Sequence, residues 1–185
     1  MTREWGWRIG ARVICTSGTD VLLLADSDPG VTGSKWWVTP GGGVDEGETP
    51  RAAAQRELYE ETGLLVTEES LIGPVAVRTV THGYSDRVRV QKEWFFRVEV
   101  ERFEVQPTAL TAGEKQRLQG HAWWPLDGLP VDVWPAALAD MAALTGDVVL
   151  DLGAVDESTV PVTPGSPPGT APGIAHRRRD EPDAE

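Results

Sequence analysis

Apolar and polar residues alternate in the first part of the chain, as expected for strands that bury one face. Between residues 8 and 16 four apolar residues share one parity, Ile9, Ala11, Val13 and Cys15, and three polar residues share the other, Arg8, Arg12 and Thr16. The segment 21–24 is apolar throughout and follows a Ser-Gly-Thr-Asp turn, which is typical of a buried strand. Another short strand is expected at 35–38. This region therefore predicts part of a sheet.

A helical pattern begins at residue 49. Residues 49–62 are rich in Ala, Arg, Glu and Leu, with Pro50 near the start and Gly63 just after the end, which predicts a helix. The mixture continues to about residue 146, with strands expected at 71–81, 87–101 and 121–126 and short helices near 111–119 and 135–144. Strands mixed with two or three helices predict an α/β or α+β fold, with helices packed on a mixed sheet.

The composition changes near residue 150. Proline and glycine become frequent, and Arg177–Arg179 is followed by acidic residues. Such a segment has too little apolar surface to offset the entropy lost on ordering. We therefore expect an N-terminal extension over residues 1–7, one domain over residues 8–150 and a disordered tail over residues 151–185.

Charge and cysteine content narrow the class of protein. The formal net charge is −12, which argues against binding along a nucleic-acid backbone but allows a polyphosphate held through divalent cations. Cys15 is the only cysteine, so no internal disulfide can form, which suits the reducing cytoplasm. The sequence contains neither an apolar run of eighteen residues nor a signal-peptide pattern, so no membrane association is expected. The oligomeric state is left open, a homodimer included.

The chemistry is concentrated in a glycine-rich loop and the predicted helix that follows it. Gly41–Gly43 lets the backbone approach a ligand closely. On the helix, Glu57, Glu60 and Glu61 fall within an arc of about 100°. Grouped carboxylate oxygens are the ligands that Mg²⁺ or Mn²⁺ requires, although an acidic helix face taken alone is more often solvated surface.

The spacing of these residues is far more specific than their presence. From Gly42 it reads Gly-x5-Glu-x7-Arg-Glu-aliphatic-x-Glu-Glu-x-Gly-aliphatic, filled by Gly42, Glu48, Arg56, Glu57, Leu58, Glu60, Glu61, Gly63 and Leu64. This is a complete Nudix box, and the chain resembles Nudix hydrolases from about residue 8 to residue 146. The resemblance implies a Nudix-type α/β/α sandwich that hydrolyses a pyrophosphate bond in a small nucleotide-type substrate.

The resemblance also implies a divalent metal site. Glu57, Glu60 and Glu61 correspond to residues that hold Mg²⁺ (or Mn²⁺) in the family, and the backbone carbonyl of Gly41 is a further candidate ligand. Either Glu57 or Glu61 is expected to help activate the attacking water.

Residues around these ligands receive supporting roles from the same resemblance. Arg56 should orient a catalytic glutamate through charge-assisted hydrogen bonds, and Glu48 should steady the loop and helix. A further carboxylate beyond the box is expected to act as ligand or base. Glu114 is the first candidate and Glu93 the second, weakened because Glu93 shares parity with the polar face of its strand.

Candidate substrate contacts are less well defined. Trp36 and Trp37 could stack on a nucleobase or pack in the core, and Gly42 and Gly43 could approach the phosphates. Four cations could contact phosphates or be ordinary surface charges: Arg12, Lys35, Arg78 and Lys92.

The leading hypothesis is a Mg²⁺-dependent hydrolase of a nucleoside di- or triphosphate or of a nucleoside diphosphate-linked compound. The alternative is a Nudix domain that senses a nucleotide ligand without turnover, but such domains commonly lose box glutamates, and all are present here. An isoprenyl diphosphate isomerase would need a catalytic cysteine, and Cys15 lies on the wrong segment.

Overall fold

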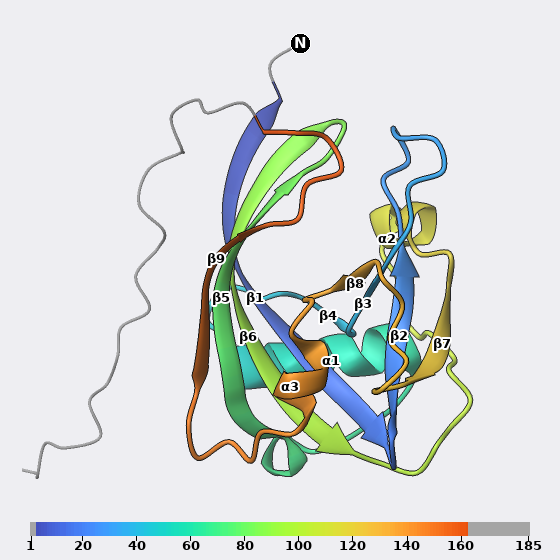
Figure 1. Cartoon of the computed structure of the whole chain (residues 1–185), viewed down its shortest axis with the longest axis vertical. Helices are drawn as coiled ribbons and strands as arrows, with labels where there is room; N and C mark the ends of the chain where they lie inside the picture. Colours follow the sequence, from blue (N-terminus) through green and yellow to red (C-terminus); the bar gives the residue numbers. More distant parts are fainter. Residues whose placement is uncertain (1–2, 163–185) are drawn as a thin grey trace, which may run out of the picture.

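The computed structural model of the chain describes residues 3–162. Within these residues nine strands form one mixed sheet (Figure 1): β1 (Glu4–Ser17), β2 (Asp20–Asp26), β3 (Trp36–Val38), β4 (Gly41–Gly43), β5 (Ile72–Gly83), β6 (Arg87–Glu99), β7 (Gly120–Pro125), β8 (Val133–Trp134) and β9 (Leu150–Asp156). Between them lie the helices α1 (Pro50–Thr62), α2 (Ala112–Arg117) and α3 (Leu138–Ala142) and a 3-10 turn (Glu68–Ser70). Each expected helix and strand is present, with shifted ends.

The central pair of the sheet joins strands that are far apart in sequence. The strand order is β8-β3-β2-β1-β6-β5-β9, with β4 paired to β1 and β7 paired to β2. β1 and β6 run parallel, and Glu4–Thr16 pairs residue by residue with Arg87–Glu99. β4 runs antiparallel to β1, so that Gly41 lies opposite Arg12. The glycine loop is therefore held beside the middle of β1.

Helices cover both faces of the sheet. On one face the side chains of α1 pack against alternate residues of β1 and β6: Ala53, Ala54 and Leu58 against Ala11, Val13, Cys15, Phe96 and Val98. On the other face α3 packs against the residues between them: Leu138 and Met141 against Ile14, Leu23 and Phe95. Full burial of a side chain as large as Leu58 contributes about 1.5–3 kcal/mol. The predicted α/β/α sandwich with a mixed sheet is confirmed.

The ends of α1 are set by local sequence. The Thr49 hydroxyl accepts a hydrogen bond from the Ala52 N–H, and Pro50 stands at the first helical position. At the other end Gly63 adopts φ 77° and its N–H donates to the Tyr59 carbonyl. These two ends fix which turn of the helix faces the glycine loop, and so where Glu57 and Glu61 emerge.

Both predicted domain boundaries need correction. Residues 4–7, assigned to an extension, belong to β1 and pair with the start of β6. Residues 150–156, mostly assigned to a disordered tail, form β9 along β5. Leu152 packs against the core cluster that contains Leu138 and Met141 of α3. The apolar residues of this stretch are few, but they alternate, and a strand edge was free to receive them. The tail prediction for residues 163–185 lies outside the described residues.

The segment after β9 fastens the turn between β5 and β6. The Ser158 hydroxyl accepts a hydrogen bond from the Gly83 N–H at 2.7 Å, and the Thr159 hydroxyl donates to the Asp28 carboxylate at 2.9 Å. Arg3 donates to the carbonyl oxygens of Tyr84 and Val160 at 2.9 and 3.1 Å. This turn borders the cavity described next, so the segment helps to position the cavity wall.

Candidate functional site

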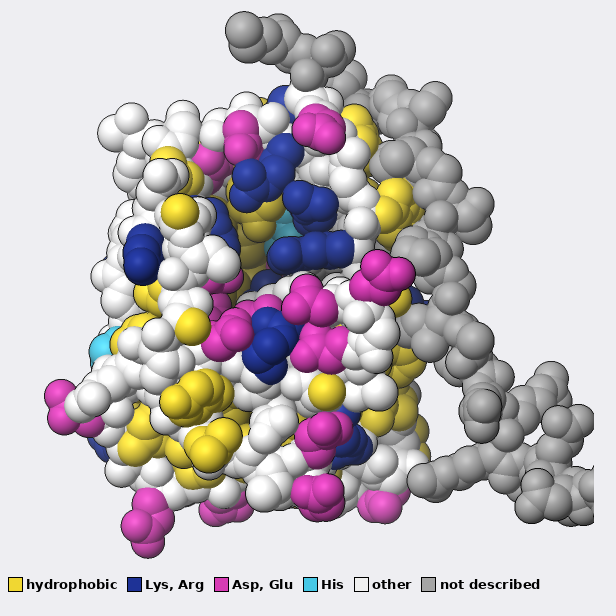
Figure 2. Space-filling model, turned by 180° about the vertical axis from the view of Figure 1, so that it is seen from behind, with side chains coloured by type: hydrophobic (Ala, Val, Ile, Leu, Met, Phe, Trp, Pro, Cys, Tyr) yellow, Lys and Arg dark blue, Asp and Glu magenta, His cyan; other side chains and the backbone are white. Residues whose placement is uncertain are grey.

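A polar cavity of about 550 Å³ opens between the glycine loop, α1, α2 and the strands β1 and β6. Figure 2 shows a hollow in which a group of Lys and Arg side chains lies beside a band of Asp and Glu side chains. The acidic side of the cavity comes from α1 and α2, and the basic side comes mainly from β1 and β6. The cavity is therefore divided into two regions of opposite charge.

Three carboxylates meet on the acidic side. Glu57, Glu61 and Glu114 each offer one oxygen, and these oxygens all lie within 4.8 Å of one another. Glu114 is held at the start of α2 by a capping box, in which Thr111 and Glu114 each accept from the backbone N–H of the other. The structure thus brings the candidate from beyond the box to the two box glutamates. Glu60 lines the cavity but is not a member of this group of three.

Burial disfavours the negatively charged forms of two box glutamates, Glu57 and Glu61. Glu61 is 6% exposed and Glu57 is 7% exposed. Burial raises the pKa of Glu61 to about 8, against the effect of the Gly41 N–H, which donates to Glu61 Oε2 at 2.7 Å. Burial likewise raises the pKa of Glu57. A divalent cation would supply the missing countercharge, so the residues present fit Mg²⁺ or Mn²⁺.

The glycine loop lies too close to its neighbours for side chains at two positions. A Cβ on Gly41, which has φ 147°, would collide with the backbone of Ala11 and Arg12. A Cβ on Gly42 would collide with the carboxylate of Glu57. Gly43 has ordinary space around it, although all three glycines line the cavity. The roles of Gly41 as ligand and of Gly42 and Gly43 as substrate contacts remain predictions.

Arg56 and Glu48 join the loop to the helix, in the positions that the sequence predicts. Arg56 Nε and Nη2 both donate to the Glu48 carboxylate at 3.0 Å, and Nη2 also donates to the Gly43 carbonyl at 2.9 Å. Arg56 Nη1 donates to Glu57 at 2.9 Å and to Glu60 at 3.2 Å. One guanidinium group therefore fixes the rotamers of three carboxylates.

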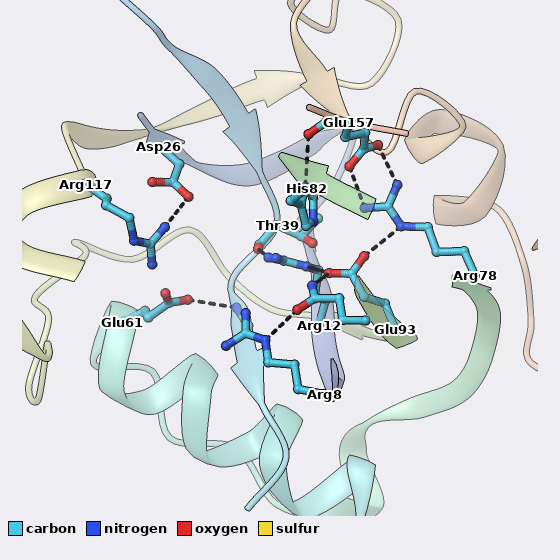
Figure 3. A network of polar contacts seen from close by, with 12 residues as sticks. Arg8, Arg12, Asp26, Thr39, Glu61, Arg78, His82, Glu93, Arg117 and Glu157 are labelled. Carbon is cyan, nitrogen blue, oxygen red and sulfur yellow. Dashed lines mark hydrogen bonds and ion pairs between the residues drawn. The ribbon is translucent and has the colours of Figure 1, made fainter. Parts of the chain in front are cut away.

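Glu93, the second candidate for an additional base or ligand, is committed elsewhere. Its side chain is fully buried and accepts hydrogen bonds from Arg12 Nε at 2.5 Å and from Arg78 Nε at 2.7 Å (Figure 3). Burial alone would raise the pKa of Glu93, but the two arginines lower it well below its usual range. Glu157 completes the network by pairing with Arg78 at 2.5 Å. Glu93 is therefore an ion-pair centre beneath the cavity.

The aromatic candidates and Lys92 do not line the cavity. Trp36 is 3% exposed and stacks on Trp134, with ring centroids 4.7 Å apart. Trp37 packs edge-on against Trp124 at 5.3 Å. Lys92 lies over the ring of Trp94, at 5.2 Å from its centroid. The core-packing alternative describes both tryptophans, and base stacking by them has no support in this geometry.

Several residues that line the cavity lie outside the Nudix box, so the box does not predict them. Arg8, Arg87, Arg89, Arg117 and Tyr84 all line the cavity, together with Arg12, which the sequence offered as a phosphate contact. Arg8 and Arg12 share the polar parity of β1, and Arg87 and Arg89 share that of β6. Parity therefore indicated a common face, but the parallel pairing of the two strands was needed to bring them together.

His82 makes folding stability depend on pH. It is 4% exposed near Arg12, Arg78 and Glu93, and burial lowers its pKa to about 4, against the effect of Glu93. The unfolded chain takes up this proton near pH 6.5, so His82 contributes stability above pH 6.5 that is lost as the pH falls toward 4. The shift corresponds to about 3 kcal/mol.

We expect urea denaturation of His82→Gln to show a smaller loss of unfolding free energy between pH 6.5 and pH 4.5 than the wild type. Glu93 titrates in both proteins, so the difference between their slopes isolates His82. Parallel slopes would show that His82 takes up its proton at the same pH in the folded and unfolded chains, and would contradict this prediction.

Comparisons with known proteins identify the family of this chain. The NUDIX domain family model matches residues 6–144. The chain is 35% identical over 114 residues to a protein named RNA pyrophosphohydrolase from Agrobacterium fabrum, covering 54% of this chain and 63% of that protein. It is 32% identical over 107 residues to one of the same name from Rhizobium meliloti, covering 54% and 64%. The chain thus spans less than two thirds of the length of these two relatives.

Solved structures share the fold. The chain is similar to a MutT NUDIX hydrolase from Burkholderia pseudomallei, with a TM-score of 0.54, 21% identity and coverage of 74% of this chain and 98% of that one. It is also similar to a MutT protein from Bacillus halodurans, with a TM-score of 0.54, 18% identity and coverage of 82% and 91%. At these identities the likeness concerns the fold alone.

Proposed function

Because the chain belongs to the NUDIX domain family, we propose that it hydrolyses a pyrophosphate bond in a nucleoside di- or triphosphate or in a nucleoside diphosphate-linked compound. The observation that carries this proposal is the group formed by Glu57, Glu61 and Glu114 beside the glycine loop. A second support is the basic side of the cavity, which suits a substrate with more negative charge than one divalent cation neutralises.

The chain's own residues would divide the work as follows. Glu57, Glu61 and Glu114 would hold Mg²⁺ or Mn²⁺, which when bound neutralises phosphate charge and acidifies a coordinated water. Arg56 holds Oε1 of Glu57, and the Gly41 N–H holds Oε2 of Glu61, so each carboxylate keeps its other oxygen for a ligand or a proton. One of these two glutamates takes the proton from the water that attacks phosphorus.

A 5′-triphosphorylated RNA end is the second candidate substrate. The relatives from Agrobacterium fabrum and Rhizobium meliloti are named RNA pyrophosphohydrolase, which suggests RNA as a substrate. The net charge of −12 disfavours binding along a long backbone, but an RNA end placed in a basic cavity needs only local positive charge. This candidate revises the expectation of a small-molecule substrate alone.

A location in the cytoplasm, predicted from the single cysteine, stays part of the proposal. Cys15 is buried, and burial raises the pKa of its thiol to about 12, so this thiol is not reactive. Among the described residues, none of the helices has the length and apolar character needed to cross a bilayer.

A substrate screen tests the activity. The purified chain with Mg²⁺ is incubated with nucleoside triphosphates, nucleoside diphosphate sugars and a 5′-triphosphorylated oligoribonucleotide, and release of phosphate and pyrophosphate is measured. We expect turnover of at least one compound, and its loss when EDTA removes the metal. Tight binding of a compound with no turnover of any would favour the ligand-sensor alternative instead.

A further inference from the structure

Among the residues that the structure describes, three arginines on the basic side of the cavity have no buried counter-ion. Arg8 lies on β1, and Arg87 and Arg89 lie on β6, on strands that pair in parallel. We call these three residues the arginine wall. All three line the cavity, across from the carboxylates of α1 and α2.

The arginine wall differs from the other cavity arginines in its partners. Arg12 is neutralised by Glu93, Arg56 by Glu48 and Arg117 by Asp26, at 2.5, 3.0 and 2.5 Å. The charges of these three arginines are therefore balanced by carboxylates of the protein. The cations left over are therefore confined to one part of the cavity.

Within the wall, the described residues provide little compensation. Arg8 is exposed in the cavity, and its Nε donates to the neutral side chain of Gln91 at 2.6 Å. Within residues 3–162 no carboxylate forms an ion pair with Arg8 or Arg89. The guanidinium of Arg89 lies over Gly6, where a Cβ atom on residue 6 would collide with it. In the described part of the chain, the one ion pair of Arg87 is with Asp86, whose side chain is 64% exposed, at 2.8 Å, and its guanidinium also lies over the Tyr84 ring, 5.3 Å from the centroid.

Like charges held close together repel one another, and an anionic ligand relieves that repulsion. Guanidinium groups bind phosphate oxygens through paired, charge-assisted hydrogen bonds. A second hollow of about 370 Å³ adjoins the cavity at Arg87 and is lined in part by Pro29, Gly30 and Gln116. A substrate that reaches the wall therefore has room to continue past it.

From this arrangement we infer that the arginine wall binds a second phosphate group of the substrate, separate from the phosphates held at Glu57, Glu61 and Glu114. This inference rests on the proposed function. The group is a further phosphoryl group of a longer polyphosphate chain or a phosphodiester to a following nucleotide. The wall makes the enzyme selective for such substrates over nucleoside diphosphate sugars, which lack the extra phosphate.

Binding of inorganic tripolyphosphate without divalent cations tests the wall apart from catalysis. We expect calorimetry to detect binding to the wild type and affinity roughly tenfold lower for each arginine removed in Arg8→Met and Arg8→Met/Arg89→Met. The control Arg102→Met removes the same charge from an exposed site outside the cavity and should bind as the wild type does. No binding to the wild type, or equal binding to the double variant, would overturn the inference. Because no turnover is needed, this result is independent of the proposed activity.

Steady-state kinetics then distinguish the two sources of the phosphate. Wild type and Arg8→Met/Arg89→Met are compared on ATP, on a 5′-triphosphorylated dinucleotide and on ADP-ribose. A loss of kcat/KM of tenfold or more for the dinucleotide alone identifies the phosphodiester, and a similar loss for ATP identifies the polyphosphate. ADP-ribose should be turned over equally by both proteins, and a uniform loss on all three substrates contradicts the inference.

Discussion

Replacing Glu61 with glutamine should lower kcat with Mg²⁺ on the order of 10³-fold, because the cation site contributes several kcal/mol of transition-state stabilisation. Glutamine is isosteric and keeps an oxygen that can accept from the Gly41 N–H. Burial already raises the pKa of Glu61 to about 8, so removing this ionisable group should not destabilise the metal-free protein. Turnover and thermal unfolding without metal are the two measurements.

Two variants provide the controls for Glu61→Gln. Glu104→Gln changes an exposed residue outside the cavity and should behave as the wild type does. Glu60→Gln should reduce turnover less than Glu61→Gln, because Glu60 lines the cavity outside the group of three carboxylates. Activity of Glu61→Gln within threefold of the wild type would show that the site lies elsewhere.

Replacing Glu93 with glutamine should lower the free energy of unfolding by about 3–5 kcal/mol, because Arg12 and Arg78 would both lose their shared buried counter-ion. Glu157→Gln should cost less, about 1–3 kcal/mol, because Arg78 then keeps its pair with Glu93. Urea denaturation near pH 7 measures both.

The order of these two effects is the informative result. Each substitution removes one carboxylate, and only Glu93 contacts two arginines. If Glu157→Gln were the more damaging, the network would depend on the segment after β9 and not on the centre of the sheet. If Glu93→Gln folded as stably as the wild type, the ion pairs would contribute no net stability.

Local sequence was sufficient for the parts of the site that lie close together in the chain. The spacing from Gly42 to Leu64, with Pro50 and Gly63 at the ends of the helix, predicts the loop, the helix and the acidic face because each depends on neighbouring residues. Glu114 could be proposed only through the resemblance. Its approach to Glu57 depends on a fold that the residues of α2 do not specify alone.

Long-range pairing explains the parts that were not predicted. Polar parity on β6 suggests a solvated face, whereas Gln91 and Glu93 are 1% and 0% exposed. The middle of this face is buried because the two neighbouring strands, β1 and β5, bring Arg12 and Arg78 to Glu93, and no local pattern encodes those partners. β9 was missed for the same reason, since its alternation is weak and its stability comes from β5 and from the contact of Glu157 with Arg78.

The most direct test of the metal site is the anomalous scattering of Mn²⁺ in a crystal of this chain. We predict a peak within coordination distance of carboxylate oxygens from Glu57, Glu61 and Glu114, and no such peak in Glu61→Gln crystals treated in the same way. Manganese bound only outside the cavity, or an unchanged peak in the variant, would contradict the assignment of these glutamates as the site of hydrolysis.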